Sequence, residues 1–208
     1  MAIRSFKDRR SVVLFDGQCP KGFPPDLVRI ARRKLRAIDA AVAVRDLTEP
    51  PGNRLEKLKG NRAGQWSIPS MINGGYVLSG WKTEPMMSKS STTNDVNPSF
   101  HRLPPLHVGE VLREEFLTPL GLSPYTIAKA LGVPRTRIER LVREETALTA
   151  DTALRLSRYF GTTAEFWMNL QTGYELECAK RTLASKLAKI ARRPSAQRTS
   201  RGRRARAA

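Results

Sequence analysis

The sequence has few residues of the kinds that build metal sites, disulfide frameworks or membrane spans. Its 208 residues include two histidines and two cysteines, Cys19 and Cys178. Two distant cysteines without a CxxC pair predict neither a disulfide framework nor a structural zinc site, and they fit a reducing compartment. No apolar run approaches the roughly 20 residues that cross a bilayer, and the first residues lack the apolar core of a signal peptide. We therefore expect a cytoplasmic protein without a metal or other cofactor.

Acidic residues are also scarce. The chain has 37 Lys and Arg against 19 Asp and Glu, a formal net charge of +18. Such an excess favours polyanionic partners such as DNA, RNA or the ribosome. The charge is uneven, because residues 97–185 carry 11 basic and 10 acidic side chains, whereas residues 186–208 carry no acidic one. The excess therefore belongs to the N-terminal part and to the tail.

The pattern of the first 68 residues predicts a mixture of strands and helices. The β-branched run Ser11–Phe15, closed by Asp16 and Gly17, is typical of a strand and turn. Pro24 and Pro25 offer a helix start, and apolar residues then recur at helical spacing as far as Ile38, with arginines between them. A second strand is expected at Gln65–Ile68. We therefore predict an α+β N-terminal part.

Residues 69–97 have neither strand nor helix periodicity over a useful length. A structureless stretch of this length is uncommon inside a compact domain. We therefore expect a linker between two domains, with boundaries at 1–68, 69–97 and 98–190. Residues 191–208 are Arg-rich and have no apolar anchors, so we expect a disordered tail.

Beyond Pro105 the sequence predicts an all-α domain of five helices. They are expected at Val108–Phe116, from the Ser123 cap to Leu131, from Pro134 to about Glu144, at Thr149–Phe160, and from Thr163 to beyond Lys180. Gly161 suits the position that ends the fourth helix. The core contacts expected from the last helix are Phe166, Trp167, Leu170, Tyr174 and Leu176.

The second and third of these helices have the pattern of a helix-turn-helix. Apolar residues from Ile127 to Leu141 supply an inward stripe, and Gly132 supplies the sharp turn. The outward residues suit phosphate and base-edge contacts in a major groove. The candidate DNA-binding residues are Thr126, Lys129, Arg135, Thr136, Arg137 and Arg140. An ordinary helical hairpin with a solvated basic face remains the alternative.

Residues 98–192 resemble the HigA-type antitoxins of the Xre/Cro helix-turn-helix superfamily. The resemblance rests on Pro105–Leu112, Thr126–Leu141, Ala147–Thr149, Leu154–Ser157 and the most specific string, Phe166–Gln171. It implies a lambda-repressor-like domain and a bacterial, nucleoid-associated homodimer. That dimer would bind operator DNA of a type II toxin-antitoxin (plasmid maintenance) operon and neutralise a HigB-type toxin. From the residues alone, we expect Trp167, Asn169 and Gln171 to be core and cap residues rather than a ligand site.

Residues 2–68 resemble the HigB-type toxins of the RelE/ParE superfamily. The resemblance rests on Ile3–Phe6, Arg32–Leu35, Ile38–Ala41, Leu55–Gly60 and Gln65–Ile68. It implies an incomplete RelE-like fold, related to ribonucleases that cut mRNA on the ribosome. Lys57, Lys59 and Arg62 are candidate phosphate-binding residues, with a solvated loop as the alternative. The closing strands with the family's catalytic residues have no counterpart after Ile68, so we expect no catalytic residues and a poorly stable, inactive remnant.

A shift of the reading frame would explain why residues 69–97 lack a regular pattern. Read in a shifted frame, the codons of residues 69–95 permit further strand-like segments that resemble the missing strands of the toxin family, followed by a stop between Asn94 and Asp95. We hypothesise that one lost base near codon 69 fused a toxin frame to an antitoxin frame. A purposeful single-chain fusion is the alternative, and an unslipped frame in the DNA of the locus would support it.

These observations favour a DNA-binding antitoxin and autorepressor that carries a toxin remnant. Two alternatives remain open. In the first, the N-terminal part is an mRNA endonuclease that the C-terminal part inhibits in cis. In the second, the C-terminal part binds a separate, intact toxin, a role compatible with DNA binding.

Overall fold

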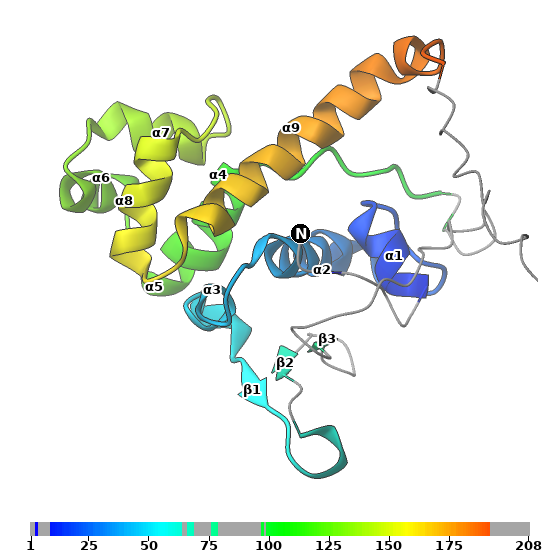
Figure 1. The fold of residues 1–208 in the computed structure, drawn as a ribbon, viewed down its shortest axis with the longest axis horizontal. Helices are drawn as coiled ribbons and strands as arrows, with labels where there is room; N and C mark the ends of the chain where they lie inside the picture. The colour runs from blue at the N-terminus through cyan, green and yellow to red at the C-terminus, as the bar shows by residue number, and fades with distance from the viewer. Residues whose placement is uncertain are drawn as a thin grey trace, which may run out of the picture.

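The computed structural model describes residues 3, 9–63, 66–68, 76–78, 97 and 99–191. The N-terminal elements are α1 (Arg9–Phe15), α2 (Pro25–Ala40), α3 (Arg45–Thr48), η1 (Pro51–Asn53), β1 (Glu56–Lys57), η2 (Gly60–Arg62), β2 (Trp66–Ile68) and β3 (Tyr76–Leu78). The C-terminal elements are α4 (Val108–Val111), the π-helical η4 (Leu112–Leu117), α5 (Thr118–Leu120), α6 (Pro124–Leu131), α7 (Arg135–Val142), α8 (Ala150–Phe160) and α9 (Ala164–Leu187). Figure 1 shows α6, α7 and α8 grouped at one end, with α9 running from them past α2. The expected tail and most of the expected linker lie outside the described residues.

The five expected helical segments of the C-terminal part are confirmed. Side-chain caps start α6, α8 and α9: Ser123 accepts a hydrogen bond from Thr126 N, Thr149 from Thr152 N, and Thr163 from Phe166 N. Gly132 and Gly161 end α6 and α8 with φ angles of 64° and 75°, which favour glycine. The caps and end glycines therefore fix the boundaries that the sequence predicted.

The first C-terminal segment changes its winding along its length. It begins as α4 and passes through η4, where the backbone N–H of Thr118 donates to the carbonyl of Arg113, five residues earlier. A π-helical turn of this kind adds one residue to a helical turn. The sequence pattern predicted a plain α-helix here, and the π-turn alters which side chains share a face.

An aromatic cluster forms the centre of the C-terminal core. The Trp167 ring centroid lies 4.9 Å from that of Phe116 and 5.2 Å from that of Phe166. The indole N–H of Trp167 donates to Thr162 Oγ1 at 2.8 Å, and the Gln171 side chain accepts from Leu148 N at 3.0 Å. The core and cap roles expected for Trp167 and Gln171 are thus confirmed. The core contact expected of Leu176 is wrong, because its side chain is exposed.

The strand expected at Ser11–Phe15 is also wrong, because these residues belong to helix α1. A five-residue apolar run does not distinguish a strand from a buried helix by its periodicity. In the structure Val13 and Leu14 are buried, and α1 packs against α2. The turn at Gly17 is confirmed, with a φ of 77°.

A small antiparallel sheet follows these helices. Strand β2 lies between β1 and β3, with Ser67 opposite Glu56 on one side and Val77 on the other. Of the strand expected at Gln65–Ile68, Trp66–Ile68 are confirmed as β2, and Gln65 lies outside the described residues. Strand β3 falls within residues 69–97, where we expected no regular structure. The described N-terminal residues thus contain both helices and strands.

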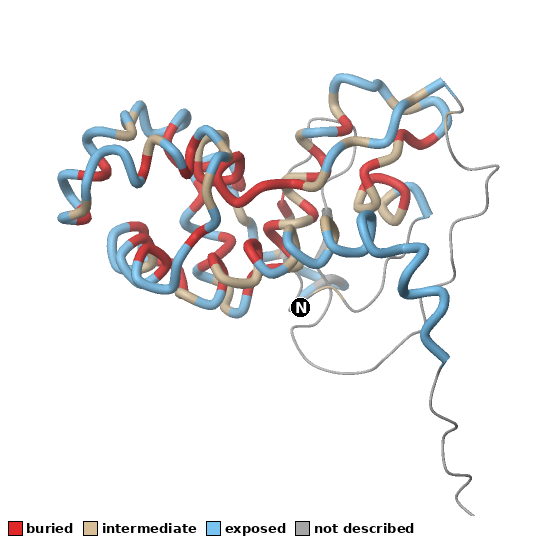
Figure 2. Tube along the Cα trace, turned by 90° about the horizontal axis from the view of Figure 1, so that it is seen from above, coloured by how far each residue is buried: buried red, intermediate tan, exposed pale blue. Residues whose placement is uncertain are grey.

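The two parts of the chain share one hydrophobic core. Buried residues of α2 and α3, among them Ile38 and Leu47, belong to the same cluster as Leu112, Phe166 and Leu170 of the C-terminal part. Figure 2 shows buried residues continuing through the region where the two parts meet. Packing of α2 along α9 accounts for much of this contact. No helix in the described ranges is long and apolar enough to cross a membrane.

Candidate nucleic-acid interface

Helices α6 and α7 form a helix-turn-helix whose inner face is apolar. Ile127, Leu131, Ile138 and Leu141 are buried between these helices and the rest of the domain. The turn between the helices follows Gly132, and Val133 N donates to Ala128 O at 3.0 Å. These contacts hold α7 so that its other face points to solvent.

The three predicted arginines of α7 lie on that outer face. Their side chains are 64%, 45% and 59% exposed for Arg135, Arg137 and Arg140. Thr136 is also exposed. The predicted exposure of this basic face is therefore confirmed, and no part of it is tucked into the core.

Each of these arginines has a carboxylate partner at the surface. Arg135 pairs with Glu139 at 2.6 Å, Arg137 with Asp151 at 2.6 Å, and Arg140 with Glu145 at 3.7 Å. Exposed ion pairs contribute at most about 1 kcal/mol, because water and salt screen them. A phosphate or a base edge can therefore replace these carboxylates at little cost.

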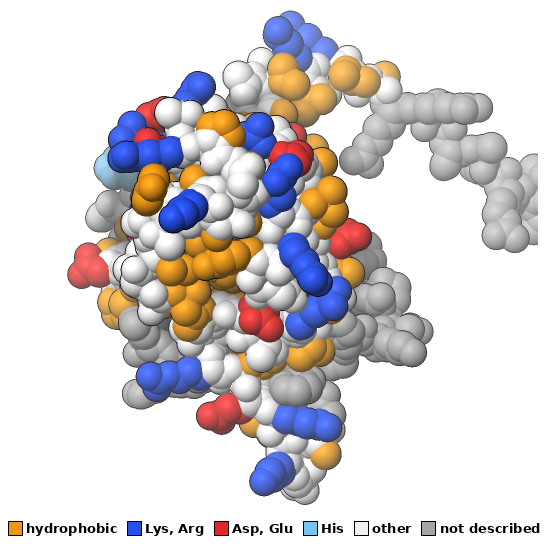
Figure 3. Space-filling view, turned by 90° about the vertical axis from the view of Figure 1, so that its left-hand side faces the viewer, with side chains coloured by type: hydrophobic (Ala, Val, Ile, Leu, Met, Phe, Trp, Pro, Cys, Tyr) orange, Lys and Arg blue, Asp and Glu red, His pale blue; other side chains and the backbone are white. Residues whose placement is uncertain are grey.

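A groove runs beside α7. Its lining comes from α7, the loop that follows and the start of α8, and consists of Pro134, Thr136, Arg137, Arg140, Leu141, Thr146, Ala147, Leu148, Thr149, Asp151 and Thr152. Hydroxyl and guanidinium groups dominate its polar lining. This end of the molecule carries Lys and Arg side chains around a central hydrophobic area, as Figure 3 shows. The groove and α7 together offer donors to a polyanion.

The two predicted residues of α6 face solvent. Thr126 and Lys129 are both exposed. The hydroxyl of Thr126 lies 2.8 Å from that of Ser123, so part of its hydrogen-bonding capacity is used at the helix cap. Lys129 lies in the last turn of α6, close to Gly132 in the chain.

Asp151 and Arg155 belong to the same surface, and our sequence analysis missed both. Asp151 accepts from Arg137 and, through its other oxygen, from Arg155 Nε at 2.9 Å. These hydrogen bonds, led by that of Arg155, lower the pKa of the Asp151 carboxyl. Arg155 also donates to Leu131 O at 2.8 Å, at the end of α6. The i,i+4 spacing of an acid and an arginine on α8 was the available signal.

The predicted phosphate-binding residues of the N-terminal part are not brought together with this surface. Lys57 in β1 and Lys59 are exposed, and Arg62 ends η2. Among the described residues no cluster of three or more His, Cys, Asp or Glu side chains is arranged to hold a metal ion.

Two family models match this chain in separate regions. Residues 112–167 match a model described as "Helix-turn-helix", and residues 4–83 match one described as "RelE-like toxin of type II toxin-antitoxin system HigB". Antitoxin HigA-1 of Vibrio cholerae is 40% identical over 72 residues, which are 35% of this chain and 68% of that protein. The chain belongs to the HigA family of helix-turn-helix antitoxins. The resemblance found in the sequence is thereby confirmed.

Two further proteins are similar to part of this chain. Virulence-associated protein I of Dichelobacter nodosus is 54% identical over 80 residues, which are 38% of this chain and 74% of that protein. The solved structure of Pseudomonas aeruginosa antitoxin HigA with higBA promoter is 43% identical and covers 42% of this chain and 96% of that one, with a TM-score of 0.41.

The N-terminal part has a relative of the toxin kind. Toxin HigB-1 of Vibrio cholerae is 49% identical over 55 residues, which are 26% of this chain. The chain spans 56% of the length of that toxin. The matching family model runs past Ile68 to residue 83, and the domain boundaries stay predictions.

Proposed function

We propose that this HigA-like chain is a sequence-specific DNA-binding autorepressor of a toxin-antitoxin operon in the bacterial cytoplasm. The observation that carries the proposal is the exposed basic face of α7, held outward by buried Ile138 and Leu141. In this role α7 enters a major groove, and Arg135, Thr136, Arg137 or Arg140 contact bases. Thr126 and Lys129 of α6 contact the DNA backbone, because both side chains are exposed on the helix that precedes α7.

A gel-shift assay with DNA from upstream of the chain's own gene tests this proposal. Replacing Arg137 and Arg140 with Ala should abolish the shift while the circular dichroism stays unchanged. The same change at exposed Arg45 of α3, outside the proposed interface, is the matched control. Binding by the wild-type chain should also weaken steeply as salt rises, because phosphate contacts release counterions. An undiminished shift by the double variant would defeat the assignment.

The proposed DNA-binding unit is a homodimer. Two copies of α7 would then lie about one DNA turn, roughly 34 Å, apart on a palindromic site. Support comes from the exposed apolar side chains of α8 beside the helix-turn-helix, since Leu154 is 62% exposed and Tyr159 is also exposed. A second copy that covered these side chains would remove them from water.

The N-terminal part is proposed to be an incomplete RelE-like toxin without ribonuclease activity. Support comes from the match to 56% of the length of Toxin HigB-1, and the proposed origin remains one lost base near codon 69. The alternative is an mRNA endonuclease inhibited in cis, in which Lys57, Lys59 and Arg62 hold RNA phosphate. Residues 1–98 expressed alone should leave growth unaffected if the remnant is dead. Growth arrest with mRNA cleavage would favour the alternative, and resequencing the locus tests the frameshift.

Neutralisation of a HigB-type toxin is the second proposed role. It is supported by the kinship with Antitoxin HigA-1 and by the toxin-like part that the same chain carries. Copurification with a small basic toxin would support binding in trans. Toxin binding also depends on the surface through which the HigA-like part contacts the toxin-like part of the same chain.

A further inference from the structure

Three carboxylates of the HigA-like part lie under helix α2, two of them buried and the third, Glu177, half-buried. Glu110 on α4, Glu115 on η4 and Glu177 on α9 form what we call the acidic docking surface. Glu110 is 2% exposed, and Glu115 is also buried. Carboxylates are seldom buried without partners, because leaving water costs several kcal/mol per ion. All three accept hydrogen bonds from cations of α2, and Glu177 also accepts from Arg181 of its own helix at 2.8 Å.

Glu110 and Glu115 of the docking surface bind one group of cations on α2. Arg29 donates to both oxygens of Glu110, at 2.7 and 2.8 Å. Arg33 donates to Glu115 at 3.1 Å and to Glu110 at 3.2 Å, and Lys34 donates to the other oxygen of Glu115. The two-point contact of Arg29 is the geometry in which guanidinium recognises carboxylate most specifically.

The π-turn explains how one arginine reaches two glutamates five residues apart. In a regular α-helix, positions i and i+5 point about 140° apart. Widening the helix in η4 brings i and i+5 closer to a common face. The two hydrogen bonds of Arg33, one to Glu110 and one to Glu115, require that common face.

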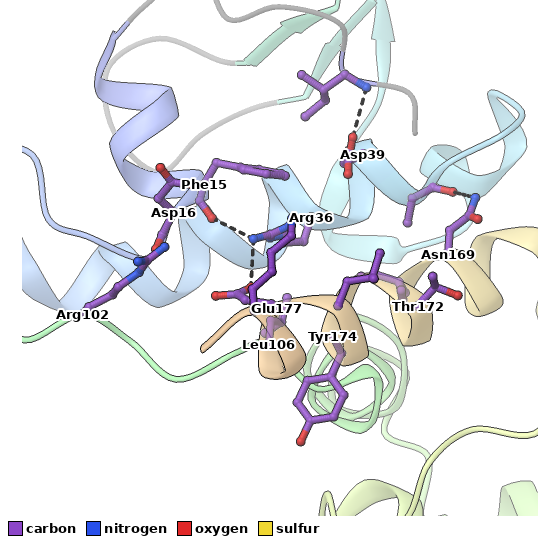
Figure 4. Close-up of a pocket in the computed structure, with 16 residues that line it drawn as sticks. Phe15, Asp16, Arg36, Asp39, Arg102, Leu106, Asn169, Thr172, Tyr174 and Glu177 are labelled. Atoms are coloured by element: carbon purple, nitrogen blue, oxygen red, sulfur yellow. Dashed lines mark hydrogen bonds and ion pairs between the residues drawn. The ribbon is translucent and has the colours of Figure 1, made fainter. Parts of the chain in front are cut away.

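Glu177, the third carboxylate of the docking surface, binds two further arginines of α2. Glu177 accepts from Arg32 at 2.6 Å and from Arg36 at 2.9 Å, and Figure 4 shows Arg36 pointing to Glu177 beside a pocket at this junction. Arg32 is 2% exposed and also donates to Pro104 O at 2.5 Å. Burial lowers the pKa of the Arg32 guanidinium, and Glu177 opposes this shift. Five cations of one helix thus meet three carboxylates of the other part.

We propose that the acidic docking surface is built to receive one basic helix and that α2 fills it in cis. The surface is therefore closed to a second basic helix, so that through this surface the HigA-like part holds the chain's own toxin-like part and not a separate HigB-type toxin. This inference rests on the proposed toxin-binding role and is independent of DNA binding. Charge complementarity of this kind selects partners and excludes others.

A cleavable form of the full chain tests the recognition. A protease site inserted within residues 85–92 allows the purified protein to be nicked after folding. The two fragments should stay associated on size exclusion at low salt and recombine after separation. Lys34→Glu or Glu115→Lys alone should weaken association at least about 30-fold, the effect of breaking a buried charge pair. Together they should restore much of it, and Arg45→Glu is the matched control. Fragments that do not recombine, or weakening that the swap does not repair, would overturn the proposal.

Competition tests the closure. The recombining N-terminal fragment from the nicked protein serves as the probe and is added to uncut chains. Uncut wild-type protein should not bind it, whereas uncut Arg29→Glu/Arg33→Glu protein, whose own α2 is displaced, should bind it. Equal binding to both proteins, or no binding to the variant, would contradict closure. A gel shift is run on the same samples. Loss or retention of the shift tests only the DNA-binding proposal, so failure of that proposal can be told apart from failure of the closure.

Discussion

Helices α4 and α7 approach each other so closely at position 109 that only glycine fits there. A Cβ atom on Gly109 would lie 1.8 Å from the carbonyl oxygen of Leu141, where α4 meets α7. Backbone atoms cannot move aside as a flexible side chain can. Glycine at this position therefore sets how closely the helix that presents the basic face sits on the domain.

Gly109→Ala should destabilise the HigA-like part strongly. The clash forces α4 and α7 apart, and overpacking of this kind costs about 2 kcal/mol or more. Urea denaturation followed by circular dichroism measures the loss. Gly173→Ala on α9, where a Cβ meets no atom within 4 Å, is the matched control and should leave stability unchanged or slightly raised. Equal stability of the two variants would show that the close approach is wrong.

His107 links stability to pH through its role at the start of α4. Its Nδ1 accepts from Gly109 N at 3.0 Å, which requires an unprotonated Nδ1. Burial lowers the pKa of His107, although the nearby carboxylates of Glu144 and Glu110 oppose the shift. The unfolded chain therefore takes up the proton first as pH falls.

The free energy of unfolding should fall as pH drops below the ordinary value of 6.5 towards the lowered pKa of His107. Above that value the contribution is fully present. Urea titrations between pH 7.5 and 5 measure it, with His107→Asn as comparison, because Asn caps a helix without titrating in this range. A pH dependence that is the same in both proteins would rule out His107 as its source.

At the scale of elements, a carboxylate of α3 supports the start of α9. Asp46 is fully buried, and it accepts from Thr163 N at 2.6 Å and from Thr163 Oγ1 at 2.9 Å. It also accepts from Val42 N and Ala43 N in the loop before α3. One side chain thus joins the N-terminal part to the cap of the longest helix.

Asp46→Ala should destabilise the whole chain by about 3 kcal/mol, because it leaves buried N–H groups without acceptors. Thermal unfolding should show a lower midpoint in both parts together. Asp26→Ala, at an exposed position in the first turn of α2, is the control and should change the midpoint little. A midpoint lowered in the N-terminal part alone would contradict the joint role of Asp46.

Some elements could be predicted from the sequence and others could not, for physical reasons. The C-terminal helices were predictable because their boundaries are marked by single residues. These are the capping residues Ser123, Thr149 and Thr163 and the glycines at the helix ends. The short run Ser11–Phe15 was assigned wrongly because five apolar residues fit a buried face of either kind. The π-turn has no signature in a pattern of 3.6-residue periodicity.

At the scale of the whole molecule, the candidate DNA-binding face was predictable from the sequence. The contact between α2 and the HigA-like part was not. Arg135, Arg137 and Arg140 follow a turn signal and share one face, so their exposure follows from local pattern. The pairing of Arg32 with Glu177 joins residues 145 positions apart, and no periodicity encodes such a contact. The sequence showed the arginines of α2 only as basic residues between apolar ones, and it gave no sign of the carboxylates that pair with them.

The proposed homodimer gives a prediction at this scale. Leu154→Glu places a charge in the exposed apolar area of α8 and should convert a two-chain particle into one of about 23.3 kDa. Light scattering after size exclusion measures the mass, and Arg45→Glu is the control for added negative charge. Monomers of the wild-type protein, or dimers of the variant, would show that this face is not the contact.

The π-turn at Leu112–Leu117 gives this segment room to change its length by one residue. Removing one residue there would restore ordinary winding and leave the flanking turns close to their present phase, because the widened turn already holds one extra residue. Glu110 and the buried ring of Phe116 would then keep their faces. A three-base deletion inside this turn would thus be absorbed, whereas the same deletion in an ordinary helical turn would rotate everything that follows by about 100°.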